Sequence, residues 1–490
     1  MTPRFPTVTY DEVADKLREE CGVVGVSGVP EASLVAALGL HALQHRGQES
    51  CGIVSHDGSR FYTERQLGLV GENFAGPDTA QRLAGDAAIG HVRYSTQGAT
   101  VLRNVQPLYA DVRGGGIAVA HNGNLTNART LREELVSGGS IFQSTSDTEV
   151  ILQLAARSPR AKSANRFLDA LKQIEGAFAL VALVNNRVIG ARDPYGIRPL
   201  VLGRLDGGYI LASETCALDI VGAKFEREIE PGEVVIISEN GLESRRFAPA
   251  RAARPCAFEY IYFARPDSVI GGISVYQARK AMGRRLYQDA PADVDVIVPV
   301  PDSGVPSALG YAEAAGKPFE MGIIRGHFAG RTFIQPTQAK RDLGVRRKHS
   351  ANAAVLRGKR VLLVDDSIVR GTTSRKIVQM VREAGAKEVH FRSACPPIIN
   401  PDFYGIDMPQ RSELMAARME IPEMTDALGA DSLGFLSVDG MYEAILGEAR
   451  NPRQPQLADH YFTGDYPTRL IDNERAVSDK DRQLSFLVDA

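Results

Sequence analysis

The hydrophobic pattern of this chain changes near residues 246–255, and this change constrains the fold more than any other feature. Before it, short apolar runs are punctuated by Gly, Asn and Asp, a pattern that predicts stacked, largely antiparallel sheets. After it, the apolar runs VDVIVPV (294–300) and RVLLVDD (360–366) are each followed by a helical segment. Such strand–helix alternation predicts a parallel α/β sheet. We therefore expect an α/β protein with two domains of different class.

The expected domain boundaries follow from length and composition. A chain of 490 residues is too long for one ordinary hydrophobic core. The segment 246–255, RFAPARAARP, is rich in Pro, Ala and Arg and is typical of a linker. We expect a leader at 1–20, a first domain at 21–250, a second domain at 257–450 and a polar C-terminal tail at 451–490.

The composition excludes several classes of function. A net charge of −2 argues against general affinity for nucleic acid or anionic membranes. The five cysteines are scattered without a CxxC pair, which indicates a reducing compartment rather than a disulfide framework. The leader lacks the apolar core of a signal peptide, and the longest apolar run, AFALVALV, is too short to cross a bilayer. We expect a cytoplasmic protein.

The stretch VLLVDDSIVRGTTSRK (361–376) has the chemistry of an anion site. An apolar strand ends in Asp365 and Asp366, and a loop with Gly371 leads into a helix, whose first N–H groups attract anions. The side chains that could donate hydrogen bonds to a phosphate are Ser367, Arg370, Thr372 and Thr373. The carboxylates suit ribose hydroxyls or Mg²⁺. Taken alone, the acid pair is equally compatible with a helix cap.

As a whole, this pattern resembles the phosphoribosyl-diphosphate (PRPP) motif of type I phosphoribosyltransferases. A second passage, VPVPDSGVPSALG (298–310), also follows an apolar strand. Its residues Asp302, Ser303 and Gly304 resemble the loop that holds pyrophosphate in that family. The resemblance implies that both loops bind PRPP. It also implies one Mg²⁺ per subunit near Ser303, Asp365 and Asp366.

A basic segment with few acids lies between the two loops, at residues 323–350. Its basic residues are Arg325, Arg331, Lys340, Arg341, Arg346, Arg347, Lys348 and His349. Such a run is usually a solvated face and sometimes a nucleic-acid patch, but the net charge speaks against nucleic acid. We interpret it as a mobile cationic lid that neutralises a polyphosphate and excludes water, with Arg331 and Lys348 binding PRPP.

The first domain begins at Cys21, in LREECGVVGVSG (17–28). A lone cysteine before an apolar strand is most often a small buried hydrophobe. The passages downstream change that interpretation: LQHRGQESCG (43–52), GHVRYSTQG (90–98), HNGNLTN (121–127) and SDTEV (146–150). Together with CGVVGV they resemble the N-terminal-nucleophile glutamine amidotransferases. This resemblance implies an αββα sandwich of the N-terminal-nucleophile hydrolase type for the first domain.

The same resemblance implies a role for the leader. In that family the thiol attacks the carboxamide of glutamine, and the free α-amino group of the same residue is the base. A backbone amide nitrogen cannot accept a proton, whereas an α-amine titrates near a pKa of ~7.7–8.0. Cys21 can use this mechanism only if the Glu20–Cys21 bond is cut, so we interpret residues 1–20 as a propeptide.

Four further residues take roles from the resemblance. The Asn122 side chain and the Gly123 N–H would form an oxyanion hole. Arg93 would pair with the α-carboxylate of glutamine through its forked guanidinium, and Asp147 with the α-amine. Each residue alone is also compatible with a surface or turn position, and HNGN in particular with an ordinary turn. Their joint occurrence in this order favours the amidotransferase.

The two halves together resemble the glutamine PRPP amidotransferases, including the junction EYIYFARPDS (259–268). That family converts PRPP, glutamine and water to phosphoribosylamine, glutamate and pyrophosphate, the first committed step of purine synthesis. The resemblance implies a homo-oligomer, dimer or tetramer, inhibited by purine nucleotides. A PRPP-sensing regulator would need neither the glutaminase residues nor the lid. An amidotransferase acting on a sugar phosphate would share only the first half.

Four positions bear on a further cofactor. Members of this family with a propeptide often hold a 4Fe–4S cluster, which needs four thiolate ligands. Cys256 matches the first ligand position, but Asp402 stands at the second, and QLADHYFTG (456–464) has no cysteine for the other two. We therefore predict a cluster-free enzyme. Cys256 and Asp402 with Asp459 and His460 could instead bind a single zinc or iron ion, or form polar surface packing.

Overall fold

The computed structural model describes residues 21–76, 78–94, 101–326, 349–406, 408 and 410–476. These residues form two compact units. The larger unit contains residues 21–76, 78–94, 101–278, 402–406, 408 and 449–476, and the smaller unit contains residues 279–326, 349–401 and 410–448. No helix in the described part of the chain has the length and apolar character needed to span a membrane.

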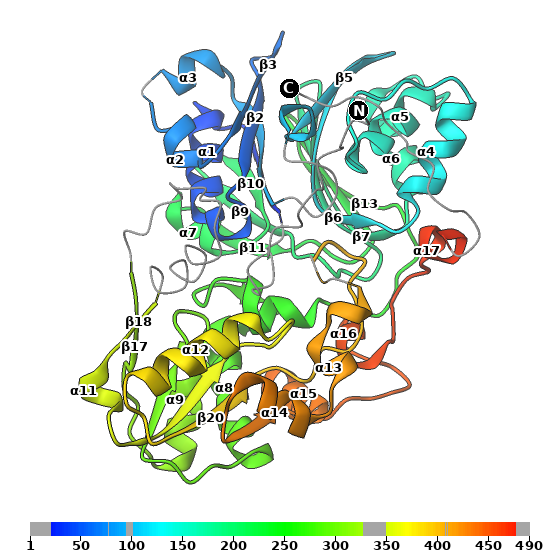
Figure 1. Cartoon of the computed structure of the whole chain (residues 1–490). Helices are drawn as coiled ribbons and strands as arrows, with labels where there is room; N and C mark the ends of the chain where they lie inside the picture. Colours follow the sequence, from blue (N-terminus) through cyan, green and yellow to red (C-terminus); the bar gives the residue numbers. More distant parts are fainter. Residues whose placement is uncertain are drawn as a thin grey trace, which may run out of the picture. The chain divides into compact units, whose positions relative to one another are not determined.

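The larger unit is built on two sheets in which all neighbouring strands are antiparallel (Figure 1). The first sheet has the order β11-β9-β10-β1-β4-β2-β3 and the second has the order β13-β12-β8-β7-β6-β5. The first sheet comprises β1 (Gly22–Ser27), β2 (Ser50–His56), β3 (Phe61–Leu67), β4 (Ala87–Arg93), β9 (Val201–Leu205), β10 (Gly208–Ala212) and β11 (Lys224–Glu228). The second comprises β5 (Leu108–Val112), β6 (Gly115–Leu125), β7 (Gly176–Val184), β8 (Arg187–Arg192), β12 (Glu233–Ser238) and β13 (Gly241–Arg246).

Helices cover the outer face of each sheet, which gives four layers. Beside the first sheet lie α1 (Ala32–Ala42), α2 (Val70–Asn73), α3 (Thr79–Arg82) and α7 (Cys216–Ile220). Beside the second lie α4 (Ala128–Ser137), α5 (Thr148–Arg157) and α6 (Ser163–Leu171). Short 3₁₀ turns occur at Gln44–Arg46 and Leu102–Asn104. The αββα sandwich expected from the sequence is confirmed.

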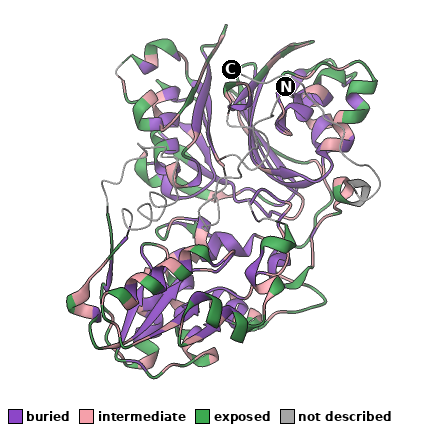
Figure 2. Cartoon of the chain, viewed as in Figure 1, coloured by how far each residue is buried: buried purple, intermediate pink, exposed green. Residues whose placement is uncertain are grey.

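Strand β1 shows why the sequence of this unit is so apolar. Its six residues are all buried, because both faces of the strand are covered (Figure 2). Val24 and Val26 pack in the cluster that includes α1, whereas Val23 packs in the cluster between the two sheets. Edge strand β3, with the sequence FYTERQL, has no buried residue and is correspondingly polar. The continuous apolar runs therefore mark the strands at the centre of the sandwich.

Segments from later in the chain complete the larger unit. They contain a π-helical turn at Glu259–Phe263, β14 (Val269–Ile270), β15 (Ile273–Ser274), α16 (His460–Thr463) and α17 (Ile471–Ala476). Leu457 and Tyr461 are fully buried here. Residues 257–278, which were expected in the second domain, and 451–476, which were expected as a C-terminal tail, have their contacts within the larger unit.

The smaller unit contains a four-stranded parallel sheet of order β16-β19-β20-β21, as the strand–helix alternation predicted. Its strands are β16 (Val296–Pro299), β19 (Arg360–Asp365), β20 (Glu388–Ser393) and β21 (Ser432–Phe435), with a separate hairpin of β17 (Ile323–Arg325) and β18 (His349–Ala351). Its helices are α8 (Val275–Asp289), which begins in the larger unit, α9 (Val305–Ala315), α11 (Ala353–Leu356), α12 (Thr372–Glu383), α13 (Met415–Arg418), α14 (Ile421–Leu428) and α15 (Val438–Leu446), with a 3₁₀ turn at Arg411–Glu413. One apolar cluster joins the sheet to α12 and α14.

Candidate functional site

Cys21 immediately precedes β1 and is half-buried. Its thiol donates to the carbonyl oxygen of Tyr94 over 3.7 Å, because β1 pairs with β4 and Tyr94 directly follows that strand. Burial raises the pKa of the Cys21 thiol, and the positive charge of Arg93 partly opposes this rise. At neutral pH the thiol is therefore protonated, so it needs a base to act as a nucleophile.

Arg93 and Asp147 lie near this thiol. Arg93 is the last residue of β4 and is buried, and its charge lowers the pKa of Cys21, whereas the charge of Asp147 raises it. Asp147 stands at the start of α5, where its Oδ2 accepts a hydrogen bond from the N–H of Leu125 over 3.1 Å. Burial alone would raise the pKa of Asp147, but His121 and the backbone N–H groups lower it overall. The structure thus brings a guanidinium and a carboxylate to the thiol.

Asn122 and Gly123 lie near the end of β6. Asn122 is fully buried, and within the described residues neither its Oδ1 nor its Nδ2 has a hydrogen-bond partner. Gly123 has a φ of +136°, and a Cβ at this position would lie 2.1 Å from the carbonyl oxygen of Ala177. Only glycine fits here. A buried amide without a partner is rare in folded proteins and points to a ligand at this place.

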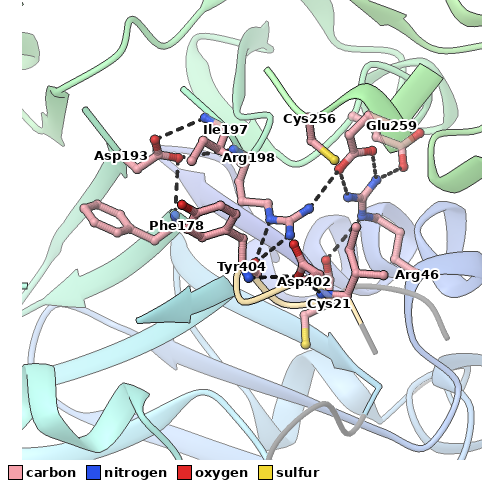
Figure 3. A network of polar contacts seen from close by, with 12 residues as sticks. Cys21, Arg46, Phe178, Asp193, Ile197, Arg198, Cys256, Glu259, Asp402 and Tyr404 are labelled. Atoms are coloured by element: carbon pink, nitrogen blue, oxygen red, sulfur yellow. Dashed lines mark hydrogen bonds and ion pairs between the residues drawn. The ribbon is translucent and has the colours of Figure 1, made fainter. Parts of the chain in front are cut away.

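Arg46 lies in the passage LQHRGQESCG, but no sequence pattern predicted a role for it. Arg46 is fully buried, and its Nε donates to the carbonyl oxygen of Cys21 over 3.2 Å. Its other nitrogens donate to Glu214 and Glu259, which are also buried, and Figure 3 shows the pairing with Glu259. No local signal marked Arg46, because the passage 43–52 is mostly polar. Its two carboxylate partners are 168 and 213 residues away.

The four positions considered for a metal or cluster are buried rather than on the surface. The Cys256 sulfur lies 3.0 Å from the hydroxyl of Tyr461, and His460 Nε2 lies 2.8 Å from Asp402 Oδ1. Asp459 is paired with Arg450. In the described part of the chain no group of three or more His, Cys, Asp and Glu side chains is arranged to hold a metal ion. A single thiol and paired carboxylates do not fit a 4Fe–4S cluster. The expected polar surface packing is corrected to buried polar pairing.

In the smaller unit the acid pair lies where β19 ends. Asp365 is the last residue of the strand, and both Asp365 and Asp366 are buried. The N–H of Asp366 donates to Asp365 Oδ1 over 2.9 Å, and the hydroxyl of Ser367 donates to Asp366 Oδ1. Neither carboxylate forms the side-chain cap of α12, since that helix has no side-chain cap hydrogen bond. The helix-cap alternative is therefore not supported.

The loop after the acid pair leads into α12. Gly371 precedes the helix with a φ of +81°, a left-handed conformation that favours glycine. Thr372 and Thr373 are the first two helical residues, and Arg370 donates from Nε to Glu413 Oε2 over 3.1 Å. The loop therefore presents hydroxyls, a guanidinium and the N–H groups of a helix start, which is a donor set for an anion.

The loop after β16 lies beside the acid pair. Strands β16 and β19 are parallel neighbours, and Gly304 packs so closely that a Cβ would lie 3.3 Å from the Cα of Asp365. Within the described residues the buried hydroxyl of Ser303 has no hydrogen-bond partner. Asp302 is exposed and forms an ion pair with Arg325. The two passages singled out in the sequence thus meet at one edge of the sheet.

Three predictions fall on residues that the structure does not describe. Arg331 and Lys348 lie outside the described residues, as does most of the basic segment between β17 and β18. Residues 1–20, interpreted as a propeptide, also lie outside them. Of the basic residues in that segment, Arg325 and His349 are described, in the paired strands β17 and β18.

Two protein families match this chain. The glutamine amidotransferase domain matches residues 75–219, and the phosphoribosyl transferase domain matches residues 274–396. An amidophosphoribosyltransferase of Rhizobium etli is 59% identical over 464 residues, 94% of each chain. One of Bacillus subtilis is 48% identical, over 93% of this chain and 95% of the relative. A solved structure of the B. subtilis glutamine PRPP amidotransferase, complexed with ADP and GMP, matches with a TM-score of 0.87 and 47% identity, over 92% of this chain and 98% of that chain.

Proposed function

This chain belongs to the amidophosphoribosyltransferase family, and we propose that its larger unit releases ammonia from glutamine at Cys21 while its smaller unit binds PRPP. The family's reaction is the first step of purine biosynthesis. The observation that carries the assignment of residues is the buried Asn122 amide without a partner, next to Gly123 and near the end of β6. A donor pair of this kind is what an acyl-transfer site needs.

In the larger unit the Cys21 thiol attacks the carboxamide carbon of glutamine. Burial raises the pKa of the thiol, so the thiol is protonated at rest and needs a base. Once the leader has been removed, the α-amine of Cys21 takes this proton during the attack. Asn122 Nδ2 and the Gly123 N–H hold the oxyanion. The same amine returns the proton to the leaving ammonia, and water then hydrolyses the γ-glutamyl thioester to glutamate.

Arg93 and Asp147 orient the substrate for this attack. The guanidinium of Arg93 takes the α-carboxylate of glutamine in a bidentate pair, and Asp147 takes the α-amine. The pKa of Asp147 is held below its usual range, so the carboxylate is ionised at neutral pH and attracts the ammonium group. Binding both α-substituents fixes the carboxamide at the thiol and converts the attack into an effectively unimolecular step.

In the smaller unit the two loops at the ends of β16 and β19 hold PRPP. Asp365 and Asp366 take the ribose hydroxyls, and Ser367, Arg370, Gly371, Thr372 and Thr373 surround the 5′-phosphate at the start of α12. Asp302, Ser303 and Gly304 receive the pyrophosphate. Ammonia then attacks the anomeric carbon of the ribose as the pyrophosphate leaves.

These residues also fit Mg²⁺. Magnesium binds through one or two carboxylates together with substrate phosphates. Asp365 and Asp366 offer such carboxylates, and the buried Ser303 hydroxyl has no partner among the described residues. When bound with PRPP, the ion would stabilise the charge of the leaving pyrophosphate. Ser303, Asp365 and Asp366 are the residues that would hold it.

Two further properties are proposed from the relatives. The B. subtilis structure carries ADP and GMP, and we propose that purine nucleotides inhibit this enzyme as end products of the pathway it begins. We also propose a homo-oligomer, dimer or tetramer. Titration of the synthase activity with AMP and GMP, together with light scattering of the purified enzyme, tests both proposals.

A comparison of nitrogen sources tests the division of labour. Cys21→Ala should abolish phosphoribosylamine synthesis from glutamine and leave synthesis from ammonia intact, because the PRPP site does not use the thiol. Asp366→Ala should impair synthesis from both sources. If Cys21→Ala still used glutamine, or if the folded variant lost ammonia-dependent synthesis, the assignment of the two chemistries to the two units would be wrong.

The lid proposal needs its own experiment. Removing the positive charge at Arg331 or Lys348 should raise the KM for PRPP and release glutamate faster than phosphoribosylamine forms, because water and ammonia would exchange more freely. The ratio of the two products, measured in the same reaction, reports this uncoupling. A ratio of one with an unchanged KM for PRPP would reject the lid.

A further inference from the structure

The loop at residues 402–406 lies directly against the end of β6 that carries the proposed oxyanion hole. Asn124 Nδ2 donates to the carbonyl oxygen of Phe403 over 2.8 Å. Gly405 has a φ of +116°, and a Cβ at this position would lie 3.1 Å from the carbonyl carbon of Gly123. Backbone therefore contacts backbone here, and the position of Gly123 depends on the position of this loop.

The Asp402 carboxylate holds the loop in shape. Its Oδ2 accepts the N–H of Tyr404 over 2.8 Å and the N–H of Ile406 over 2.7 Å. Its Oδ1 lies 2.8 Å from Nε2 of His460, and both side chains are buried. One carboxylate thus satisfies two backbone donors of the loop and binds a helix of the same unit, α16. Its removal would leave two buried N–H groups without an acceptor.

Arg198 also holds this loop in place, through hydrogen bonds to its backbone. Its Nε and Nη2 both donate to the carbonyl oxygen of Tyr404, and Figure 3 shows the guanidinium beside Asp402. The backbone N–H of Arg198 donates to Asp193 over 3.2 Å, and Asp193 also accepts the N–H of Phe178 over 3.3 Å. Phe178 is the residue opposite Gly123 on the neighbouring strand β7. The contacts form one continuous buried network around the end of β6.

We propose that Asp402 is a positioning residue for glutamine hydrolysis: with Arg198, it holds the 402–406 loop against Gly123 and Asn124 and so fixes the oxyanion donors. The proposal rests on the function proposed above for Asn122 and Gly123. It gives a role to a position that the sequence leaves open between a lost cluster ligand, a ligand of a single metal ion and polar packing. The carboxylate accepts hydrogen bonds from the N–H groups of Tyr404 and Ile406, which an apolar side chain packed at this position could not accept.

The geometry explains why the oxyanion donors depend on this support. Within the described residues the Asn122 amide has no hydrogen bond of its own, so its position depends on the backbone of β6 and on the atoms packed around it. Gly123, whose N–H is the other donor, has no side chain to pack. A displacement of catalytic groups by about 1 Å can lower a rate by ~10²-fold. The support must therefore come from neighbouring backbone, and the 402–406 loop supplies it.

The experiment compares Asp402→Ala with Asp402→Asn in the processed enzyme. Alanine removes both acceptor oxygens, so kcat for glutamine-dependent glutamate release should fall by about 10- to 100-fold. The KM for glutamine should change little, because Arg93 and Asp147 remain. Asparagine keeps the shape and one acceptor oxygen for the two N–H groups, so it should restore most of kcat. Ammonia-dependent synthesis should equal that of the parent in both.

Glu233→Gln is the matched control. Glu233 is a buried carboxylate of the same unit that accepts the N–H of Glu230 over 2.7 Å and pairs with Arg227, in strand β12. A general loss of stability would affect this variant and Asp402→Ala alike, whereas the proposal predicts parent kcat for Glu233→Gln. If Asp402→Ala does not fold, Gly405→Ala provides the test, since its new Cβ would displace Gly123 directly.

A double variant that carries both Asp402→Ala and Asn122→Ala distinguishes a failure of this inference from a failure of the proposed function. If Asp402 acts through the oxyanion hole, Asp402→Ala should lower kcat by a smaller factor in the Asn122→Ala background than in the parent, because only the Gly123 donor is left to displace. Independent, multiplying effects would overturn the inference, as would a parent-like kcat for Asp402→Ala or a loss confined to KM. A parent-like kcat for Asn122→Ala would instead refute the oxyanion assignment itself, and the inference would fall with it.

Discussion

Arg46 donates a hydrogen bond from Nε to the carbonyl oxygen of Cys21 over 3.2 Å, so the residue that bears the nucleophile is tied to a fully buried guanidinium. The other nitrogens of Arg46 contact Glu214 and Glu259. Burial alone would lower the pKa of Arg46, but the two carboxylates raise it overall, and the side chain is permanently charged. The start of β1 is therefore fixed by a buried charged cluster.

Replacing Arg46 should destabilise the larger unit strongly. Arg46→Met leaves Glu214 and Glu259 buried without their main partner, and breaking a buried ion pair in this way costs about 3–5 kcal/mol. Arg46→Lys keeps the charge but loses the forked geometry, so its loss should be smaller. Urea unfolding followed by circular dichroism measures both. An unchanged urea midpoint in Arg46→Met would show that the cluster does not stabilise the fold.

The same cluster should make stability depend on pH. Burial alone would raise the pKa of Glu214, but His45 and Arg46 hold it well below its usual range. A carboxyl group with a lowered pKa in the folded state stabilises the fold above its unfolded pKa of ~4.3. That stabilisation is lost as the pH falls below this value. Unfolding free energies measured from pH 7 down to acid should decrease, and Glu214→Gln should flatten the decrease.

Glu239→Gln is the control for this titration, because Glu239 is an exposed carboxylate of the same unit. It should leave the slope of stability against pH unchanged. An equal flattening by both variants would mean that the acid sensitivity arises from general charge repulsion rather than from Glu214.

Gly123 should be intolerant of alanine for two separable reasons. Its φ is +136°, and a Cβ would collide with the carbonyl oxygen of Ala177. Gly139 also has a positive φ, +87°, but a Cβ there would meet nothing within 4 Å. Gly139→Ala should therefore cost only the conformational strain, about 1–2 kcal/mol, and retain glutamine-dependent activity.

Gly123→Ala should lose that activity while retaining ammonia-dependent synthesis, which isolates the steric clash at the proposed oxyanion hole. Parallel assays with glutamine and with ammonia measure the difference. Equal glutaminase rates in the two alanine variants would contradict a close backbone role for Gly123.

Local sequence patterns predicted where individual strands and loops lie along the chain. An apolar run that ends in two acids, such as 361–366, places Asp365 at the end of a strand whichever partners the strand has. The apolar run after Cys21 likewise predicted the strand found at β1. HNGN, which is also compatible with an ordinary turn, lies instead within strand β6, where Gly123 has a positive φ.

Contacts between distant segments could not be predicted in this way. Arg46 meets Glu259 across 213 residues, and Arg198 meets Tyr404 across 206. No periodicity links such residues, since their pairing is decided by how the layers stack. For the same reason residues 402–406 were read as part of the second domain, although their contacts place them in the larger unit. The buried state of Asp402 and His460 also depends on that docking.

The proposed cleavage between Glu20 and Cys21 can be tested directly. If the α-amine of Cys21 is the base, active enzyme must begin at Cys21, because an amide nitrogen cannot accept the thiol proton. Intact-mass measurement of enzyme with full glutaminase activity should show loss of residues 1–20. Full glutamine-dependent activity in a chain with an intact leader would exclude the α-amine mechanism.

The last prediction concerns iron. Of the four ligand positions that the resemblance implies for a 4Fe–4S cluster, only Cys256 has a thiol, and that thiol already lies 3.0 Å from the Tyr461 hydroxyl. Burial raises the pKa of Cys256 to about 11, so the thiol is protonated at neutral pH when no metal is bound. Asp402 is engaged by two backbone N–H groups and His460.

Enzyme purified without oxygen should therefore be colourless and contain no acid-labile sulfide, and exposure to air should not inactivate it. Because carboxylates and imidazole could still hold a single zinc or iron ion, elemental analysis of the same preparation distinguishes a lone ion from a cluster. Stoichiometric iron with matching sulfide would overturn the prediction. Cys256→Ser provides the internal check, since it should leave activity and metal content unchanged if the thiol serves only to pack against Tyr461.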